Sequence, residues 1–297
     1  MVFKRQTEGS VVCTSCGKLV AVTDEKCWHC GRRNPGLWGY AAAFRALGDD
    51  LGFTRAVIGV CLFLYVLMLA AFPDQISNRG ILSFLSPGSS AAELFGASGY
   101  LPIFGGGRFW TVLSAGLLHG GLIHIGFNLY WLNQLGPLMA KLYGPGRAMI
   151  LFVATSVAGF VVTSAVAWIN LNLFGIQGFR RLSSFGLGGA PITLGASAAI
   201  FGWIGCLVYY GRRTGSSLFS GQLMGFIVPL FLIGFLLPGV DNWAHIGGFA
   251  GGYFFAKRLD PMRPERIDHI VLGLALFAIM LLSVVVSVVT GWPILKG

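Results

Sequence analysis

Seven apolar segments separated by short basic stretches constrain the fold of this 297-residue chain more than any other feature. A helix needs about 20 apolar residues to cross the hydrocarbon of a bilayer, and most of these segments approach that length. Only 11% of the residues are charged, whereas soluble domains carry about 25%. The sequence therefore predicts an all-α polytopic membrane protein, with spans at 56–72, 121–140, 147–170, 196–211, 221–238, 243–257 and 268–290.

The basic residues lie in short runs between the apolar segments and do not form one binding face, although the formal net charge is +10. This distribution argues against a nucleic-acid partner and is typical of loops that set membrane topology. With the N-terminus inside, 16 of the 21 Lys and Arg residues fall on the inner side and 5 on the outer side. We therefore expect a multi-pass protein of the cell (cytoplasmic) membrane, with its N-terminus in the cytosol and its C-terminus outside. The polar start MVFKRQTEGS does not resemble a signal peptide, which agrees with a cytosolic head.

The stretch HGGLIHIGFN, residues 119–128, places two imidazoles and an amide in a segment otherwise suited to lipid. Such groups are costly in hydrocarbon and usually face a partner or a wet cavity, so they indicate a functional site. His124 and Asn128 are four residues apart and share one helix face. His119 precedes them beyond a Gly-Gly pair and is expected nearer the loop.

A second polar residue, Ser197, stands where a Gly- and Pro-rich loop becomes an apolar helix. At a helix N-terminus the free backbone N–H groups and the helix dipole favour a developing negative charge. Taken alone, the serine is equally well explained as an ordinary N-cap.

A third polar residue, His245, begins an apolar segment that carries the glycine pairs 247/251 and 248/252. Small residues at this spacing allow another helix to approach closely. Taken alone, the histidine could be an interfacial side chain bonded to a carbonyl. Together with Ser197 it makes the minimal set for acyl-transfer catalysis, a nucleophile and a base. Asp241 lies at the outer edge of this segment, so we interpret the pair as a dyad without a third carboxylate.

The three clusters resemble the motifs of rhomboid intramembrane serine proteases, in the order found in that family. The His-x4-His-x3-Asn, Gly-x-Ser and Ala-His-x-Gly-Gly patterns are met by His119, His124 and Asn128, by Gly195, Ser197, Phe201 and Gly202, and by Ala244, His245, Gly247 and Gly248. The resemblance covers roughly residues 50–260. It implies a six-helix bundle, to which the last apolar segment adds one C-terminal transmembrane helix.

The resemblance also implies a role for each matching residue. Ser197 would be the nucleophile and His245 the general base and acid. His124, Asn128 and the backbone N–H of Ser197 would form the oxyanion hole. The supporting residues would be Gly195, Phe201 packed on the His245 ring, His119 shaping the nearby loop, and Gly248 and Gly252 holding the sixth helix against the fourth. The reaction implied is hydrolysis of peptide bonds in or near transmembrane segments of substrate proteins within the bilayer, with no cofactor for catalysis.

Two positions depart from the family pattern, and a second serine also matches its Gly-x-Ser motif. The usual Trp-Arg pair of the first outer loop is Trp110-Thr111 here, with an arginine at Arg108. Ala198 follows the serine where many members have glycine, and its methyl group is expected to tighten the oxyanion pocket. Ser98, in GASG, also matches Gly-x-Ser-Gly, but no long helix follows it, so we interpret it as structural.

Four cysteines near the N-terminus, Cys13, Cys16, Cys27 and Cys30, form two Cys-x2-Cys pairs. Four thiolates in this pattern predict a closed tetrahedral structural zinc site. Two disulfides are disfavoured in a reducing cytosol, and a redox Cys-x-x-Cys would not need duplication. Such a ribbon cannot build a core without metal, and whether it binds a cytosolic partner stays open.

The predicted organisation is a zinc ribbon at 1–40, a linker at 41–55, a rhomboid core at 56–260, and a seventh helix with its tail at 261–297. A catalytically silent rhomboid-like protein that binds membrane clients is the first alternative. A transporter or channel is the second, but it predicts repeats between the halves, which the sequence lacks.

Overall fold

The computed structural model describes residues 5–296, with gaps at 14–15, 42–47 and 79 and over most of 217–238. The helices are α2 (Phe53–Ala71), α3 (Ser89–Phe95), α4 (Thr111–Ser114), α5 (Leu122–Tyr143), α6 (Pro145–Ser184), α7 (Ser197–Thr214), α9 (Asn242–Arg258) and α10 (Ile267–Lys296). Short 3₁₀ turns lie at Leu37–Gly39, Pro73–Gln75, Ile81–Ser83 and Ala115–Leu117, the last labelled η5, and one π turn at Leu101–Gly105. The strands β1 (Ser10–Val12) and β2 (Leu19–Ala21) pair antiparallel.

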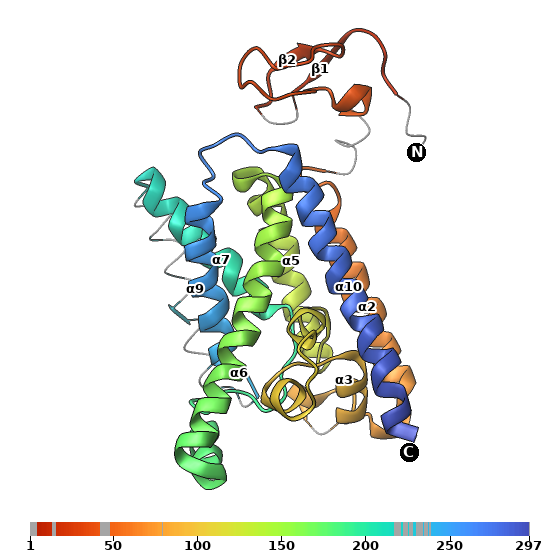
Figure 1. The fold of residues 1–297 in the computed structure, drawn as a ribbon, viewed down its shortest axis with the longest axis vertical. Coiled ribbons are helices and arrows are strands. Elements are labelled where there is room, and N and C mark those ends of the chain that lie inside the picture. The colour runs from red at the N-terminus through yellow and green to blue at the C-terminus, as the bar shows by residue number, and fades with distance from the viewer. Residues whose placement is uncertain are drawn as a thin grey trace.

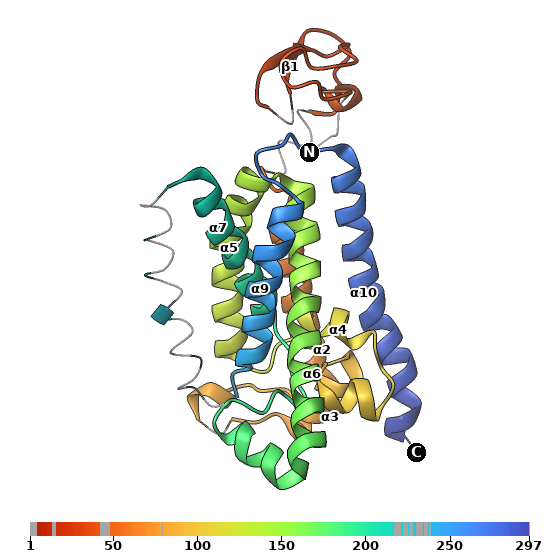
Figure 2. The ribbon, with the colours of Figure 1, turned by 60° about the vertical axis from the view of Figure 1, so that its left-hand side comes forward.

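The long helices form one bundle, with the β1–β2 head at one end (Figure 1). Helix α7 packs on α5, α6 and α9, and it carries the fully buried Trp203. Helix α10 lies on another side, against α3, α4 and α6 (Figure 2). The bundle therefore buries α7 at its centre, which is where an apolar helix with a polar start can be shielded from lipid.

Glycines set the distance between α9 and its two neighbours. A Cβ atom on Gly248 or Gly252 would collide with the backbone carbonyls of Ala198 and Gly202 on α7. A Cβ on Gly247 would lie 2.7 Å from the Val162 side chain of α6, and Gly251 also faces α6. The pair Gly248/Gly252 therefore allows α9 to approach α7, and the pair Gly247/Gly251 allows it to approach α6. Both contacts require that these positions have no side chain.

The described helices account for part of the predicted membrane spans. By length and hydropathy, three described helices could cross a bilayer, namely α2, α6 and α10. A fourth span is formed if the segment Thr111–Leu117 and α5, which meet at a 90° bend, count as one. Helices α7 and α9 have only 18 and 17 residues, and both end in basic residues, so they are short for a span. The segment predicted at 221–238 lies largely outside the described residues, so the count of seven stays a prediction.

The predicted spans at 147–170 and 196–211 leave a Gly- and Ser-rich loop at 171–194 between them, and the structure corrects this for residues 171–184. Helix α6 continues to Ser184, and its only residue with non-helical dihedrals is Gly175, with φ 63°. The glycines in this stretch suggested a loop, but a single positive-φ glycine bends the helix and allows it to resume. The first outer loop, 73–118, is also partly helical, because it contains α3, α4 and four short turns.

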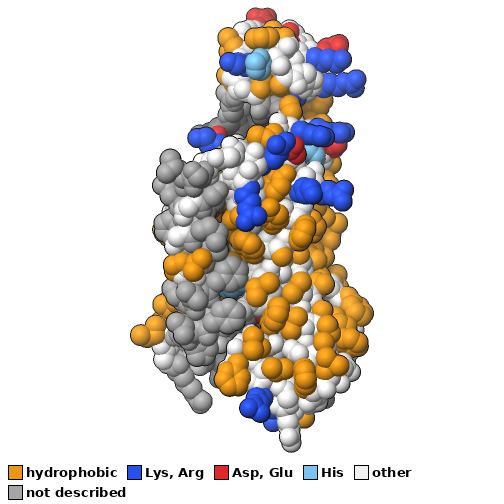
Figure 3. Space-filling model, turned by 90° about the vertical axis from the view of Figure 1, so that its left-hand side faces the viewer, with side chains coloured by type: hydrophobic (Ala, Val, Ile, Leu, Met, Phe, Trp, Pro, Cys, Tyr) orange, Lys and Arg blue, Asp and Glu red, His pale blue; other side chains and the backbone are white. Residues whose placement is uncertain are grey.

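Charge is distributed unevenly along the bundle. Figure 3 shows Lys and Arg side chains gathered over the head and the adjoining end of the helices, with hydrophobic side chains below them. The C-terminus of α10 lies at the other end (Figure 1). We propose that the head side is cytosolic and that the C-terminus is outside, as the 16-to-5 division of basic residues indicates.

This orientation predicts the outcome of a reporter-fusion experiment. A reporter fused before residue 1 should report the cytosol, and one fused after residue 297 should report the outside. A matched control ends the chain at residue 262, before α10, and should return the C-terminal reporter to the cytosol. Finding both termini of the full chain on the same side would contradict the proposed orientation.

Candidate active site and metal centre

The first residue of α7 and an early residue of α9 meet through a hydrogen bond. His245 Nε2 lies 2.9 Å from Ser197 Oγ, and the imidazole is buried. The ring stacks on Phe201, with centroids 4.1 Å apart and planes inclined by 16°. Because Phe201 lies one turn after Ser197 on the same helix, it orients the histidine toward the serine.

Gly195 allows the approach to Ser197 from the side of α5. Its φ of 136° is a conformation that side chains rarely adopt. A Cβ at this position would lie 2.7 Å from His124 Nε2 and 3.6 Å from Ser197 Oγ. The glycine therefore leaves space between the imidazole of His124 and the serine hydroxyl.

Local hydrogen bonds fix the orientation of His124. The backbone N–H of Gly120 donates to His124 Nδ1 at 3.2 Å. In the neutral ring the proton then sits on Nε2, which faces Gly195 and is available as a donor. One turn later Asn128 is almost fully buried, and its Nδ2 donates to the His124 carbonyl at 2.8 Å. An amide NH₂ has two hydrogens, so a second donor remains on Asn128.

His119 lies between η5 and α5 and is completely buried. Its ring packs edge-on against His124, with centroids 5.3 Å apart. The structure therefore places His119 behind His124, where it limits the movement of that ring.

Asp241 caps α9 and lies one turn before His245. Its Oδ1 accepts hydrogen bonds from Thr163 Oγ1 at 2.8 Å and from Ala244 N at 3.1 Å. Among the residues that the structure describes, no side chain bonds to His245 Nδ1. The geometry thus contains a serine–histidine pair without a carboxylate partner, and Asp241 instead fixes α9 to α6.

Ser98 is joined by hydrogen bonds to Thr193 and Thr111. Its backbone pairs with Thr193, and its hydroxyl accepts a hydrogen bond from Thr111 Oγ1 at 3.4 Å. The methyl group of Ala198 packs in a cluster with Ala115, Phe160 and Ala244, and a Cβ on Gly159 would meet it at 2.7 Å. The methyl group therefore fills the contact between α7 and α6.

Two contributors to the site were missed by the sequence analysis, and both are backbone groups. The Ala115 carbonyl accepts a hydrogen bond from Gly195 N at 2.9 Å, and the Gly120 N–H orients His124. Backbone groups leave no residue-type signal, so no sequence pattern could have identified Ala115.

Comparison with known proteins identifies the family. The Rhomboid domain family matches residues 106–261, which include every residue of the site just described. This chain belongs to the Rhomboid family.

Curated rhomboid relatives are similar over about half of this chain. Rhomboid protease GluP of Bacillus subtilis (strain 168) is 29% identical over 157 residues, which is 52% of this chain and 26% of GluP. RHOMBOID-like protein 4 of Arabidopsis thaliana is 26% identical over 57% of this chain and 39% of its own length. Inactive RHOMBOID-like protein 8 of the same plant is 27% identical over 56% of this chain and 42% of its own length. The chain thus spans less than half the length of these relatives, and the family holds both proteases and inactive members.

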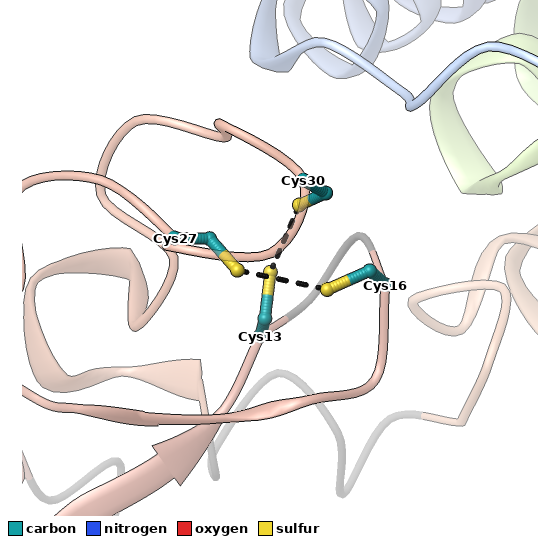
Figure 4. Close-up of side chains that lie close together, drawn as sticks. All are labelled: Cys13, Cys16, Cys27 and Cys30. Carbon is teal, nitrogen blue, oxygen red and sulfur yellow. Dashed lines mark hydrogen bonds between the residues drawn. The ribbon is translucent and has the colours of Figure 1, made fainter.

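The head of this rhomboid brings its four N-terminal cysteines together (Figure 4). Their sulfur atoms all lie within 4.8 Å of one another, with 3.7 Å between Cys13 and Cys30 and 3.6 Å between Cys16 and Cys27. Zn–S bonds of about 2.3 Å in a tetrahedron require sulfur atoms about 3.8 Å apart, so the cluster fits zinc. No disulfide joins these four cysteines in the part of the chain that the structure describes.

Backbone turns pre-form each half of this centre. Gly17 N donates to the Cys13 carbonyl at 3.0 Å, and Gly31 N donates to the Cys27 carbonyl at 2.9 Å. Burial raises the pKa of the Cys27 thiol, but hydrogen bonds from the backbone of Cys30 and His29 and from neighbouring thiols lower the pKa to about 7 overall. A thiol that loses its proton readily near neutral pH is suited to bind a metal.

Metal analysis of the purified chain should return about one zinc per molecule. The double variant Cys13→Ser with Cys16→Ser should lose it, whereas Cys61→Ala, in the buried face of α2, should keep it. Full zinc retention in the double variant would show that the thiolates are not the ligands.

Proposed function

We propose that this protein is an intramembrane serine endopeptidase that cleaves membrane proteins in or near their transmembrane segments. The observation that carries the proposal is the 2.9 Å contact between Ser197 Oγ and His245 Nε2 inside an apolar bundle. A buried polar pair of this kind has little structural value in a membrane and is most simply explained by chemistry. GluP, a relative named as a protease, supports the same interpretation.

The first chemical step is attack of Ser197 Oγ on the substrate carbonyl carbon, while His245 Nε2 accepts the hydroxyl proton. The carbonyl π electrons move onto oxygen and give a tetrahedral oxyanion. His124 Nε2–H, the Asn128 amide and the Ser197 backbone N–H are the donors proposed to stabilise this charge. Ser197 begins α7, so its N–H has no acceptor within the helix.

The second step returns the proton from His245 to the leaving amine and leaves an acyl ester on Ser197. Water then attacks the ester while His245 accepts its proton. The bond to Ser197 Oγ breaks, His245 gives the proton to that oxygen, and the new carboxyl end is released. Phe201 keeps the imidazole in its plane through both steps, because its ring stacks on the histidine. No step requires a metal, so zinc in the head would be structural.

Substrate choice follows from the state of a peptide bond in a membrane helix. Such a bond is shielded by intrahelical hydrogen bonds, so the segment must unwind before Ser197 can reach its carbonyl. Helices with small or helix-breaking residues near the cut unwind more easily. The substrates proposed are therefore single-span proteins of the same bilayer with such segments.

The proposed organisation is a zinc ribbon at 1–40, a linker at 41–55, the protease core at 56–260 and the seventh helix with its tail at 261–297. The ribbon is a candidate contact for a cytosolic partner. The alternative is a catalytically silent protein that binds membrane clients. The similarity to a relative named as inactive supports this alternative. That alternative predicts capture of a transmembrane substrate without cleavage.

The deciding experiment measures cleavage of a model single-span substrate by the purified chain in detergent. Ser197→Ala and His245→Ala should each lower the rate about 10⁴-fold or more, and the double variant should be no worse, because the two residues act as one unit. The matched control Ser98→Ala should cut at the normal rate. Substantial activity in Ser197→Ala would refute the serine-protease proposal, and capture without cleavage by the unmodified chain would favour the silent binder.

The same assay tests the oxyanion donors. His124→Ala or Asn128→Ala should reduce turnover about 10- to 1000-fold, the range for loss of one such donor. Substrate capture should change less, since the oxyanion exists only in the transition state. Normal turnover in both variants would mean that the oxyanion is stabilised by backbone groups alone.

A further inference from the structure

The seventh helix is joined to the first outer loop by a buried serine. Ser287 of α10 is completely buried, and its hydroxyl accepts a hydrogen bond from Trp110 Nε1 at 2.9 Å. Its backbone carbonyl accepts a second bond from Arg108 Nη2 at 3.0 Å. Arg108 also donates to the Glu93 carbonyl at 2.7 Å and lies over the Trp110 ring at 5.9 Å.

These contacts explain the departure from the usual Trp-Arg pair. Arg108 and Trp110 are two positions apart, yet the guanidinium carbon lies over the indole ring, 5.9 Å from its centroid. Their polar atoms are directed at one residue of α10, 177 to 179 positions away in the sequence. The loop is therefore held from outside by the seventh helix as well as by its own contacts.

Contacts continue from Ser287 through Gly96 and Ser114 toward Gly195. Gly96 packs against the hydroxyls of both Ser114 and Ser287, because a Cβ there would collide with them. Ser114 Oγ in turn donates to the Gly96 carbonyl at 2.6 Å. The next residue after Ser114 is Ala115, whose carbonyl accepts the hydrogen bond from Gly195 N at 2.9 Å.

A second contact holds the same segment between two helices. A Cβ on Gly116 would meet the Met280 methyl group of α10 at 2.7 Å and the Ser156 hydroxyl of α6. The turn η5 therefore packs tightly between α6 and α10. Its first residue, Ala115, bonds to Gly195. Gly195 is two residues before Ser197 and lies between that serine and His124.

We infer that Ser287 is a positioning residue for the nucleophile, acting through Trp110 and η5 on the backbone of Gly195. The effect of Ser287 on the cleavage rate rests on the proposed function. The structural connection from Ser287 to Gly195 can be measured without any cleavage. Helix α10 is then a part of the machinery that orients Ser197.

Ser287→Ala removes the acceptor of the Trp110 indole N–H and leaves the rest of α10 in place. The loss of this partly buried hydrogen bond should lower kcat about 3- to 10-fold with little change in KM. Ser283 provides a matched control, because it is also buried on α10. Among the described residues, its hydroxyl bonds only to the Met280 carbonyl of its own helix. Ser283→Ala should therefore leave kcat unchanged.

The experiment combines cleavage kinetics with hydrogen exchange of the full chain in detergent, and thermal unfolding of each variant shows that it is folded. In Ser287→Ala, amide exchange should accelerate in peptides covering 108–117 and in the peptide containing Gly195. Trp110→Phe removes the donor of the same bond, so the double variant with Ser287→Ala should be no slower than either single variant.

The outcomes separate the two proposals. A kcat in Ser287→Ala equal to that of Ser283→Ala, or faster exchange confined to 108–117, would overturn the positioning role. If the unmodified chain cleaves no substrate, the proposed function fails, and hydrogen exchange alone tests whether Ser287 positions Gly195. Faster amide exchange at Gly195 in Ser287→Ala then supports this positioning role, and unchanged exchange at Gly195 overturns it.

Discussion

The contact between α7 and α9 is the constraint on which the rest of the site depends. Gly248 and Gly252 face the carbonyls of Ala198 and Gly202, and Gly205 of α7 packs in the same way on the carbonyl of Phe249. With any side chain at these positions the helices would have to separate. If α7 and α9 moved apart by the width of a methyl group, the 2.9 Å hydrogen bond between Ser197 and His245 would break.

Hydrogen bonds from neighbouring residues order the polar side chains of the site. Gly120 holds His124, the His124 carbonyl holds Asn128, and Thr163 holds Asp241 at the start of α9. A buried polar group in a membrane is costly when it lacks a partner, so these bonds stabilise the arrangement before any substrate arrives. Donors already fixed toward a developing charge need no reorganisation during the reaction.

Short-range patterns in the sequence were sufficient to predict the membrane class, the family and the residues gathered at the site. The Cys-x2-Cys spacing likewise placed four thiols in one cluster, because each pair lies on one tight turn. Features that depend on distant or backbone partners were not predictable. The helix through 171–184 depends on one glycine conformation, the direction of the Ala198 methyl depends on Gly159, and the bonds of Arg108 and Trp110 depend on Ser287. None of these partners is marked by a local pattern.

The central claim is that Ser197 is a nucleophile activated by His245. The most direct test is labelling of the purified chain with a fluorophosphonate, followed by mass spectrometry of its peptides. The account predicts one adduct, on the peptide that contains Ser197, and its loss in His245→Ala. An adduct on Ser98, or labelling of Ser197 that proceeds equally fast without His245, would contradict it.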